Sequence, residues 1–271
     1  MICQAYPIPH FEDATLTAIC EDVTEDIKAK QPRRRAVIVC PGGAYHGLAA
    51  HEGDPIAFRF LAAGFAAFVL RYSTKERAAA FRPLCELALA IRFLREHADD
   101  FHLDPDYIFT CGFSAGGHLA GSAGVLWDIP EVQQYMAGAP REICRPTGMI
   151  LCYPVITSHD QFGHKGSFKR LCGTDAFDPE KAAHFSLEKH VTSSTSPAFL
   201  WHTFADNGVH VNNSLMMANA LATAGVPFEA HVFPTGGHGL GLCDGAYGDP
   251  NPHNACWIDL AITWAKGLSI N

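Results

Sequence analysis

The 271-residue sequence predicts an α/β fold in which a mostly parallel central sheet is flanked by helices. Two observations lead to this expectation. Short β-rich segments alternate with segments that carry a helical pattern of apolar residues, which is typical of right-handed β-α-β crossovers. Five of the strand segments are apolar throughout, as strands that are buried on both faces of a parallel sheet usually are.

The first half of the chain supplies five of these elements. The segment RAVIVC (35–40) predicts a strand, DPIAFRFLAAG (54–64) a helix, and FAAFVLRY (65–72) a second strand. Apolar residues recur at a spacing of 3.6 within 84–101, which predicts an amphipathic helix there. The apolar segment YIFTCG (107–112) follows it as the next strand.

The second half continues the alternation. Three further strands are expected at 147–154, 197–205 and 228–234, and three further helices at about 115–126, 211–225 and 254–268. Gly225-Val226-Pro227 is a clear helix stop, because glycine commonly follows a helix and proline cannot continue it. No linker or internal repeat is recognisable, so we expect one domain over residues 1–271.

One stretch interrupts the alternation. Residues 155–196 are rich in Gly, Ser, Thr, His and Lys and contain only short helical patches such as FDPEKAAHF (177–185). We therefore expect a small, cap-like excursion over the sheet, which is a candidate lid or substrate wall.

The composition excludes several classes of protein. Hydrophobic residues make up 48% and charged residues 18% of the chain, as in an ordinary globular protein. Twenty basic against 28 acidic residues give a net charge of −8, and the one dense basic run, Arg33 to Arg35, lies directly before an expected strand. A nucleic-acid partner is therefore not expected. A homo-oligomer is left open.

Location and redox state follow from the N-terminus and the cysteines. The first residues lack a basic segment followed by an apolar one, and the longest apolar run (61–70) is too short to span a bilayer. We expect a cytoplasmic protein with no membrane contact. The ten cysteines are irregularly spaced without C-x-x-C, and Cys40, Cys111 and Cys152 lie inside apolar strands. Reduced thiols and no zinc site are expected.

The segment CGFSAGGHLAG (111–121) places Ser114 among glycines directly after an expected strand. The pattern G-x-S-x-G between a strand and a helix is typical of a nucleophile elbow, whose strained turn exposes the serine hydroxyl. The alternative is that these glycines only allow a helix to pack closely on a strand.

An activated serine needs a base within hydrogen-bond reach and an acid that orients the base. Asp206 follows the expected strand 197–205, and His238 follows the strand 228–234 in a glycine-rich segment. The chain order Ser, Asp, His places all three at the carboxyl edge of the sheet. An Asx turn is the alternative role for Asp206, and Asp244 is the reserve acid.

The oxyanion of a tetrahedral intermediate needs backbone N–H donors. The segment VIVCPGGAYHG (37–47) ends an expected strand in a glycine-rich loop at the first βα turn. We expect the donors to be the amides of Gly43 or Ala44, together with the amide of Ala115.

With these residues the chain resembles the α/β-hydrolase esterase/lipase superfamily, in particular its compact carbohydrate-esterase-like members, the acetyl-xylan and acetyl esterases. The resemblance extends over nearly the whole chain and rests on five segments. These are CPGGAYHGLAAHEGDPIA, GFSAGGHLA, LCYPVIT, TSPAFLWHTFADNGVHVNNSLMMANAL and HVFPTGGHGLGL. The chain departs from the family pattern at Pro41, which replaces the first His of the lipase motif, at Ala44, which replaces its last Gly, and at His210, where proline is commoner.

The resemblance implies an α/β-hydrolase fold and a triad of Ser114, Asp206 and His238 that forms an acyl-enzyme. It implies a small-molecule ester as substrate, with short acyl groups on a sugar or another polyol, and no cofactor. Two alternatives remain. A peptidase of the prolyl-oligopeptidase type usually carries a large extra domain that this chain lacks. A non-catalytic α/β-hydrolase that acts as a binding module usually has a broken triad.

Other candidate residues are expected near the triad. Bulky side chains near the expected site are Tyr45, Phe113, Trp201 and Phe204, of which Tyr45 and Phe113 are expected to bind substrate. Glu52 and Asp54 are expected to start or cap the helix 54–64, or to line the acyl pocket. Structural roles are expected for His118 and His202. No metal is expected, because His46, His51, His159 and His164 lack the spacing of ligands.

Overall fold

Eight strands form one continuous sheet in the computed structural model, which describes residues 1–269. In chain order they are β1 (Ile2–Ile8), β2 (Phe11–Cys20), β3 (Arg34–Cys40), β4 (Ala66–Arg71), β5 (Leu103–Phe113), β6 (Gly148–Cys152), β7 (Ala198–Thr203) and β8 (Phe228–Phe233). Their spatial order is β1-β2-β4-β3-β5-β6-β7-β8. The pairs β1/β2 and β2/β4 are antiparallel, and every other pair is parallel. The expected mostly parallel sheet is confirmed.

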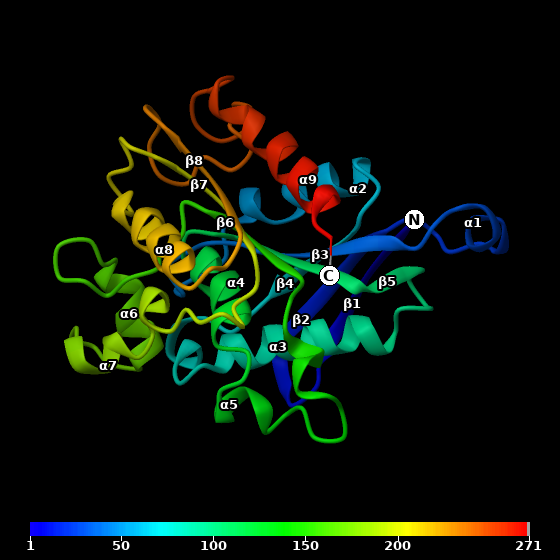
Figure 1. Cartoon of the computed structure of the whole chain (residues 1–271), viewed down its shortest axis with the longest axis horizontal. Coiled ribbons are helices and arrows are strands. Elements are labelled where there is room, and N and C mark those ends of the chain that lie inside the picture. Colours follow the sequence, from blue (N-terminus) through cyan, green and yellow to red (C-terminus); the bar gives the residue numbers. More distant parts are fainter. Residues whose placement is uncertain (270–271) are drawn as a thin grey trace.

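The helices cover both faces of this sheet (Figure 1). The α-helices are α1 (Glu25–Lys30), α2 (Asp54–Ala62), α3 (Arg82–Glu96), α4 (Ala115–Val125), α5 (Pro130–Gln133), α6 (Lys165–Cys172), α7 (Pro179–Ala183), α8 (Asn212–Thr223) and α9 (Trp257–Gly267). Helices α2 and α9 lie on one face, and α3, α4 and α8 lie on the other. This is the layered arrangement that the alternation of strands and helices predicts.

Two apolar cores lie on the two faces of the sheet. Phe60 of α2 and Trp257 of α9 pack in one core with the side chains that β3, β5 and β7 direct to that face. Leu87 and Ile91 of α3 and Leu119 of α4 pack in the other core. Each fully buried side chain of this size contributes roughly 1.5–3 kcal/mol to folding. The parallel strands are thereby fixed on both sides, and the loops at their carboxyl ends are held in place.

The N-terminal hairpin of β1 and β2 was not expected. Most side chains of β1 are exposed, and Pro7 is tolerated because the strand lies at the edge of the sheet. The two strands are joined by Pro9 and His10, and His10 takes a φ of 68°, a conformation that glycine adopts more readily. The hairpin therefore lacks the Asn-Gly or Asp-Gly signal that marks such turns in a sequence.

The helix expected over 84–101 begins and ends at other residues in the structure. Helix α3 begins at Arg82 with Pro83 in its first turn, where the missing N–H has no intrahelical partner to lose. The helix ends at Glu96, and the chain then turns so that the Leu103 amide donates to the carbonyl of Ala98. That turn brings the chain directly into β5, which is longer than the expected strand 107–112.

The excursion between β6 and β7 is present as expected, and it contains more helix than the sequence indicated. Besides α7, it holds α6, whose first turn is capped by His164, since the imidazole Nδ1 accepts the Ser167 amide at 3.3 Å. The excursion lies beside α8 in Figure 1. Its residues Phe168, Phe185 and Leu187 are buried, so the segment packs on the body of the protein.

The ten cysteines are all unpaired. Burial raises the pKa of the Cys40 and Cys152 thiols well above their ordinary value. These two side chains are therefore small apolar residues of the sheet.

Candidate active site

Ser114 occupies the single residue between β5 and α4, with φ 53° and ψ −117°. A residue with a Cβ rarely adopts this conformation, so the turn is strained. The neighbouring glycines leave room for this turn beside other backbone segments. A Cβ on Gly112 would overlap the carbonyl group of Gly116, and a Cβ on Gly116 would overlap the carbonyl of Cys40. The glycines thus allow close packing, and the serine carries the strain.

The hydroxyl group of Ser114 lies next to His238, which follows β8. Ser114 Oγ is 2.8 Å from His238 Nε2, and His238 Nδ1 is 2.7 Å from Asp206 Oδ2. Because a carboxylate can only accept, Nδ1 carries the proton, and Nε2 is left to accept the serine O–H. The three side chains expected to act together are therefore brought into one hydrogen-bonded chain.

Asp206 follows β7 and is fully buried at its side chain. Its Oδ1 accepts the amides of Gly208 and Val209 at 2.8 and 2.9 Å, while Oδ2 faces His238, with His202 Nε2 at 3.3 Å. Burial raises the pKa of this carboxyl group, but hydrogen bonds from His202, His238 and Val209 outweigh burial and hold the pKa well below its ordinary range. One oxygen of Asp206 thus accepts the bonds of the Asx turn, and the other faces the imidazole of His238.

The reserve acid Asp244 lies elsewhere. Its side chain is exposed, and Oδ1 accepts the Ala246 amide at 3.0 Å. In the part of the chain that the structure describes, Asp244 makes no hydrogen bond to His238.

The loop after β3 is a tight turn with an unusual backbone conformation. Gly43, Ala44 and Tyr45 are consecutive residues with positive φ, at 128°, 57° and 57°. The carbonyl of Gly43 accepts the amides of His46 and Gly47, which closes the turn. The backbone amides of Gly43, Ala44 and Ala115 make no hydrogen bond to another group within residues 1–269.

The bulky side chains expected around the site lie mainly in the interior. Phe113 is fully buried and packs against Tyr153 and Trp257, because β5 turns this side chain to the α9 face of the sheet. Tyr45 is 1% exposed. These positions do not support the expected contact of Phe113 and Tyr45 with substrate. Trp201 is also buried, and Phe204 is exposed.

Tyr45 instead donates a hydrogen bond to His118. Tyr45 Oη is 2.9 Å from His118 Nδ1, and His118 Nε2 is 2.7 Å from the carbonyl of Phe185. Burial lowers the pKa of His118 to about 4, against an ordinary 6.5, and the bond to Phe185 only partly opposes this. His118 is thus a neutral imidazole that connects the loop after β3 with the excursion.

A pH dependence of stability follows from His118. The folded protein keeps His118 neutral down to about pH 4, whereas the unfolded chain takes up a proton below about pH 6.5, so acid favours unfolding in this window. At about 1.4 kcal/mol for each pKa unit, roughly 3 kcal/mol of stability is lost from pH 6.5 to pH 4. Urea unfolding of wild type and His118→Gln across this window measures the loss, and the variant should show a shallower dependence. Equal slopes would contradict the prediction.

The other polar candidates have structural contacts. His51 Nε2 is 2.9 Å from the carbonyl of Gly239, His159 stacks on Phe162, and His164 caps α6. Asp54 lies in the first turn of α2, as expected. No cluster of three or more His, Cys, Asp or Glu side chains suited to a metal is found in the described residues 1–269.

Sequence reasoning did not find the contacts of Glu52. The cap of α2 is Gly53, without any side-chain hydrogen bond, and Glu52 is buried with its carboxyl group 2.8 Å from the Gly42 amide. The only signal in the sequence is the proximity of a glutamate to the segment CPGGAYHG.

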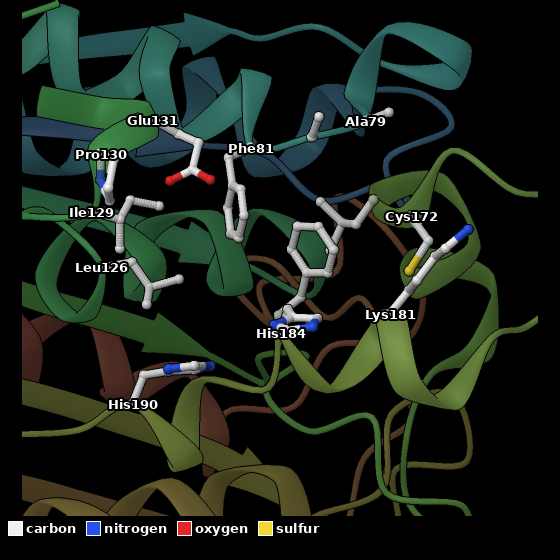
Figure 2. A pocket seen from close by; sticks show the side chains of 13 residues that line it. Ala79, Phe81, Leu126, Ile129, Pro130, Glu131, Cys172, Lys181, His184 and His190 are labelled. Carbon is white, nitrogen blue, oxygen red and sulfur yellow. The ribbon is translucent and has the colours of Figure 1, made fainter. Parts of the chain in front are cut away.

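A cavity of about 460 Å³ lies apart from the triad. Figure 2 shows the side chains around it, which come from three parts of the chain. Phe81 belongs to the start of α3, Leu126 and Ile129 follow α4, and Cys172 and His184 belong to the excursion. None of the triad residues lines it. The excursion thus forms one wall of a largely apolar cavity away from Ser114.

Among the helices of residues 1–269, none has the length and apolar character needed to cross a membrane.

Known proteins resemble this chain over most of its length. The model of the BD-FAE family matches residues 22–221. Endo-1,4-beta-xylanase B of Butyrivibrio fibrisolvens is 39% identical over 211 residues, which are 77% of this chain and 33% of that protein. The acetylxylan esterase of Xylanibacter ruminicola is 29% identical over 217 residues, 79% of this chain and 42% of that protein. The chain therefore spans less than half the length of these two curated relatives.

Solved structures match the chain from end to end. The acetyl ester-xyloside bifunctional hydrolase of Caldicellulosiruptor lactoaceticus is 36% identical with a TM-score of 0.82, and the match covers 97% of this chain and 95% of that one. The carboxylesterase Cest-2923 of Lactobacillus plantarum is 27% identical with a TM-score of 0.83, and the match covers 100% of both chains.

Proposed function

The chain belongs to the BD-FAE family of α/β-hydrolase esterases, and from this we propose that it hydrolyses short-chain, acetyl-type esters with Ser114 as nucleophile, His238 as base and Asp206 as the acid that orients it. The observation that carries the proposal is the hydrogen-bonded chain of these three side chains, with distances of 2.8 and 2.7 Å. The elbow conformation of Ser114 supports the same role.

The reaction runs in two halves. His238 Nε2 takes the proton of Ser114 as Oγ attacks the ester carbonyl carbon, and the resulting tetrahedral intermediate collapses when the C–O bond to the alcohol breaks. The alcohol leaves with the proton from His238. Water, deprotonated by the same imidazole, then attacks the acyl-enzyme and releases the carboxylic acid and the free serine. Asp206 fixes the tautomer of the imidazole and stabilises the imidazolium in both halves.

The negative charge on the carbonyl oxygen needs donors that are in place before the reaction. The unbonded amides of Gly43, Ala44 and Ala115 supply them from two elements, the loop after β3 and the first turn of α4. The N-terminus of α4 adds the positive end of a helix dipole at the same place. No cofactor takes part in this scheme.

We propose an acetylated sugar or polyol as the substrate. The names of the acetylxylan esterase and of the acetyl ester-xyloside hydrolase among the relatives support it. Three neighbouring rings also support it. The Phe162 ring of the excursion stacks on the His159 ring with centroids 4.9 Å apart, and it is tilted by 36° to the His210 ring, whose centroid lies 4.8 Å away. His210 is four residues from Asp206, and flat aromatic faces suit the C–H face of a sugar ring.

Acyl-chain preference tests this proposal. We expect p-nitrophenyl acetate to exceed the octanoate in kcat/KM by at least about tenfold. The apolar cavity of about 460 Å³ is not lined by the triad, so it does not serve as an acyl pocket for the methylenes of a long chain. The measurement is kcat/KM over a series of p-nitrophenyl esters, and acetylated xylose should be deacetylated as well.

Other outcomes identify the alternatives. A preference for octanoate would contradict the short-chain proposal, and cleavage of a prolyl peptide at the rate of the acetate would indicate a peptidase. A fluorophosphonate probe tests the non-catalytic alternative, because it labels only an activated serine. Labelling of native but not of heat-denatured protein is expected.

A further inference from the structure

Glu52 is a buried glutamate between the oxyanion loop (residues 41–47) and the histidine loop (residues 234–243). It is 2% exposed, and a buried carboxyl group requires hydrogen-bond donors for both oxygens. Oε2 accepts the amide of Gly42 at 2.8 Å, and Oε1 accepts the phenol of Tyr153 at 2.7 Å. The two contacts join Glu52 to the backbone of the oxyanion loop and to Tyr153, the residue that follows β6.

Tyr153 extends this connection to the histidine loop. Its Oη accepts the Gly241 amide at 2.9 Å, three residues after His238. Burial, and after it the Glu52 carboxyl group, raise the pKa of Tyr153 well above its ordinary value, so the phenol keeps the proton that it donates to Glu52. The Tyr153 ring also lies edge-on to the His238 ring, with centroids 5.2 Å apart.

The connection passes directly beside the nucleophile. A Cβ on Gly42 would lie 2.5 Å from Glu52 Oε2 and 3.0 Å from the Cβ of Ser114, so Gly42 is held between the two side chains. Glu52 accepts the Gly42 amide, whereas the next two amides, of Gly43 and Ala44, make no hydrogen bond within residues 1–269.

We propose that Glu52 is a positioning residue that sets the oxyanion loop and, through Tyr153, the histidine loop in one common geometry. The proposal rests on the proposed serine esterase function. Within residues 1–269, Glu52 makes no hydrogen bond to Ser114, Asp206 or His238. It acts by fixing where the oxyanion donors and the base lie relative to Ser114, and a misplacement of about 1 Å can cost as much as 100-fold in rate.

The variant Glu52→Gln tests the proposal. Glutamine has the same size but only one acceptor oxygen, and its NH2 group must face one of the two donors, Gly42 N–H or Tyr153 O–H. We expect kcat for p-nitrophenyl acetate to fall at least about tenfold with KM changed less than about threefold. Inhibition by a trifluoromethyl ketone, whose adduct with the serine carries an oxyanion, should weaken in proportion to kcat/KM.

Glu86→Gln is the matched control. Glu86 is also fully buried, and its carboxyl group accepts from the Ser73 amide, the Ser73 hydroxyl and Arg82 Nε at 2.8, 2.5 and 3.1 Å. This control should lower the melting temperature while kcat of the folded enzyme stays within about twofold of wild type. A positioning role for Glu52 is overturned if both variants lower kcat equally, or if Glu52→Gln leaves the ketone inhibition unchanged.

The coupling of the two loops is tested with Tyr153→Phe, which keeps the ring and removes the bonds to Glu52 and Gly241. If Glu52 and Tyr153 act as one unit, the double variant Glu52→Gln/Tyr153→Phe should lose no more activity than the more impaired of the two single variants. Fully additive losses would overturn the coupling. If wild type and Ser114→Ala do not differ on p-nitrophenyl acetate, the esterase proposal fails. If they differ and Glu52→Gln behaves as wild type, only the role of Glu52 fails.

Discussion

Replacement of Ser114 by alanine is expected to lower kcat for p-nitrophenyl acetate by about 10⁴-fold or more. The hydroxyl oxygen lies 2.8 Å from His238 Nε2 and is the atom that would form the acyl-enzyme. Alanine retains the Cβ and accepts the same elbow conformation, so the loss should come from the chemistry. Any remaining rate would come from binding and from the amides of the oxyanion loop.

Two controls distinguish a loss of the chemical step from a loss of folded protein. Thermal unfolding of Ser114→Ala should match that of wild type closely, and fluorophosphonate labelling should disappear. Retention of more than about a tenth of wild-type turnover by the pure variant would show that another residue is the nucleophile.

His238→Ala is expected to be comparably inactive, because the serine then has no base and the leaving alcohol has no acid. The side chain of Asp206 would keep its bonds to the amides of Gly208 and Val209, so the loop after β7 should hold its shape. The predicted result is a fall of several orders of magnitude in kcat, measured with p-nitrophenyl acetate, with the fold retained.

His231→Ala is the control for that experiment. The two histidines are alike in setting: His231 is 29% exposed at its side chain and lies 2.8 Å from Glu229, whereas His238 is 27% exposed and lies 2.7 Å from Asp206. His231 belongs to β8 itself, upstream of the histidine loop. The control should keep turnover close to wild type, and equal losses in the two variants would count against a specific base at His238.

The central part of the fold could be predicted because its signals are local and strong. The apolar strands β3 to β7 and the helices between them are marked by composition and period, and the right-handed crossover rule then gives their parallel arrangement. The same rule placed Ser114, Asp206 and His238 at one edge of the sheet, since each follows a strand that ends there. The hydrogen-bond distances between these side chains could not be derived from the sequence.

The parts that could not be predicted depend on contacts between distant residues. The side chains of β1 are mostly exposed, so no apolar pattern marks this strand, which forms by pairing with β2. The interior position of Phe113 depends on which face of β5 it occupies, and in a strand that is apolar on both faces the sequence does not say which face carries the site. The contact of Glu52 with Tyr153 spans 101 positions along the chain.

The hydrogen bond between His118 and the carbonyl of Phe185 limits how this enzyme could be diversified by loop exchange. Loops between strands are the usual place where a scaffold gains new specificity, and the excursion at 155–196 is the natural segment to graft from another protein. A graft must still present a backbone carbonyl where Phe185 now does, because otherwise the His118 N–H is buried without an acceptor, at a cost of about 1–3 kcal/mol. A displaced His118 would also alter the hydrogen bond that its Nδ1 accepts from Tyr45 of the oxyanion loop. An exchange of the excursion therefore has to preserve this one carbonyl group if the catalytic centre is to keep its geometry.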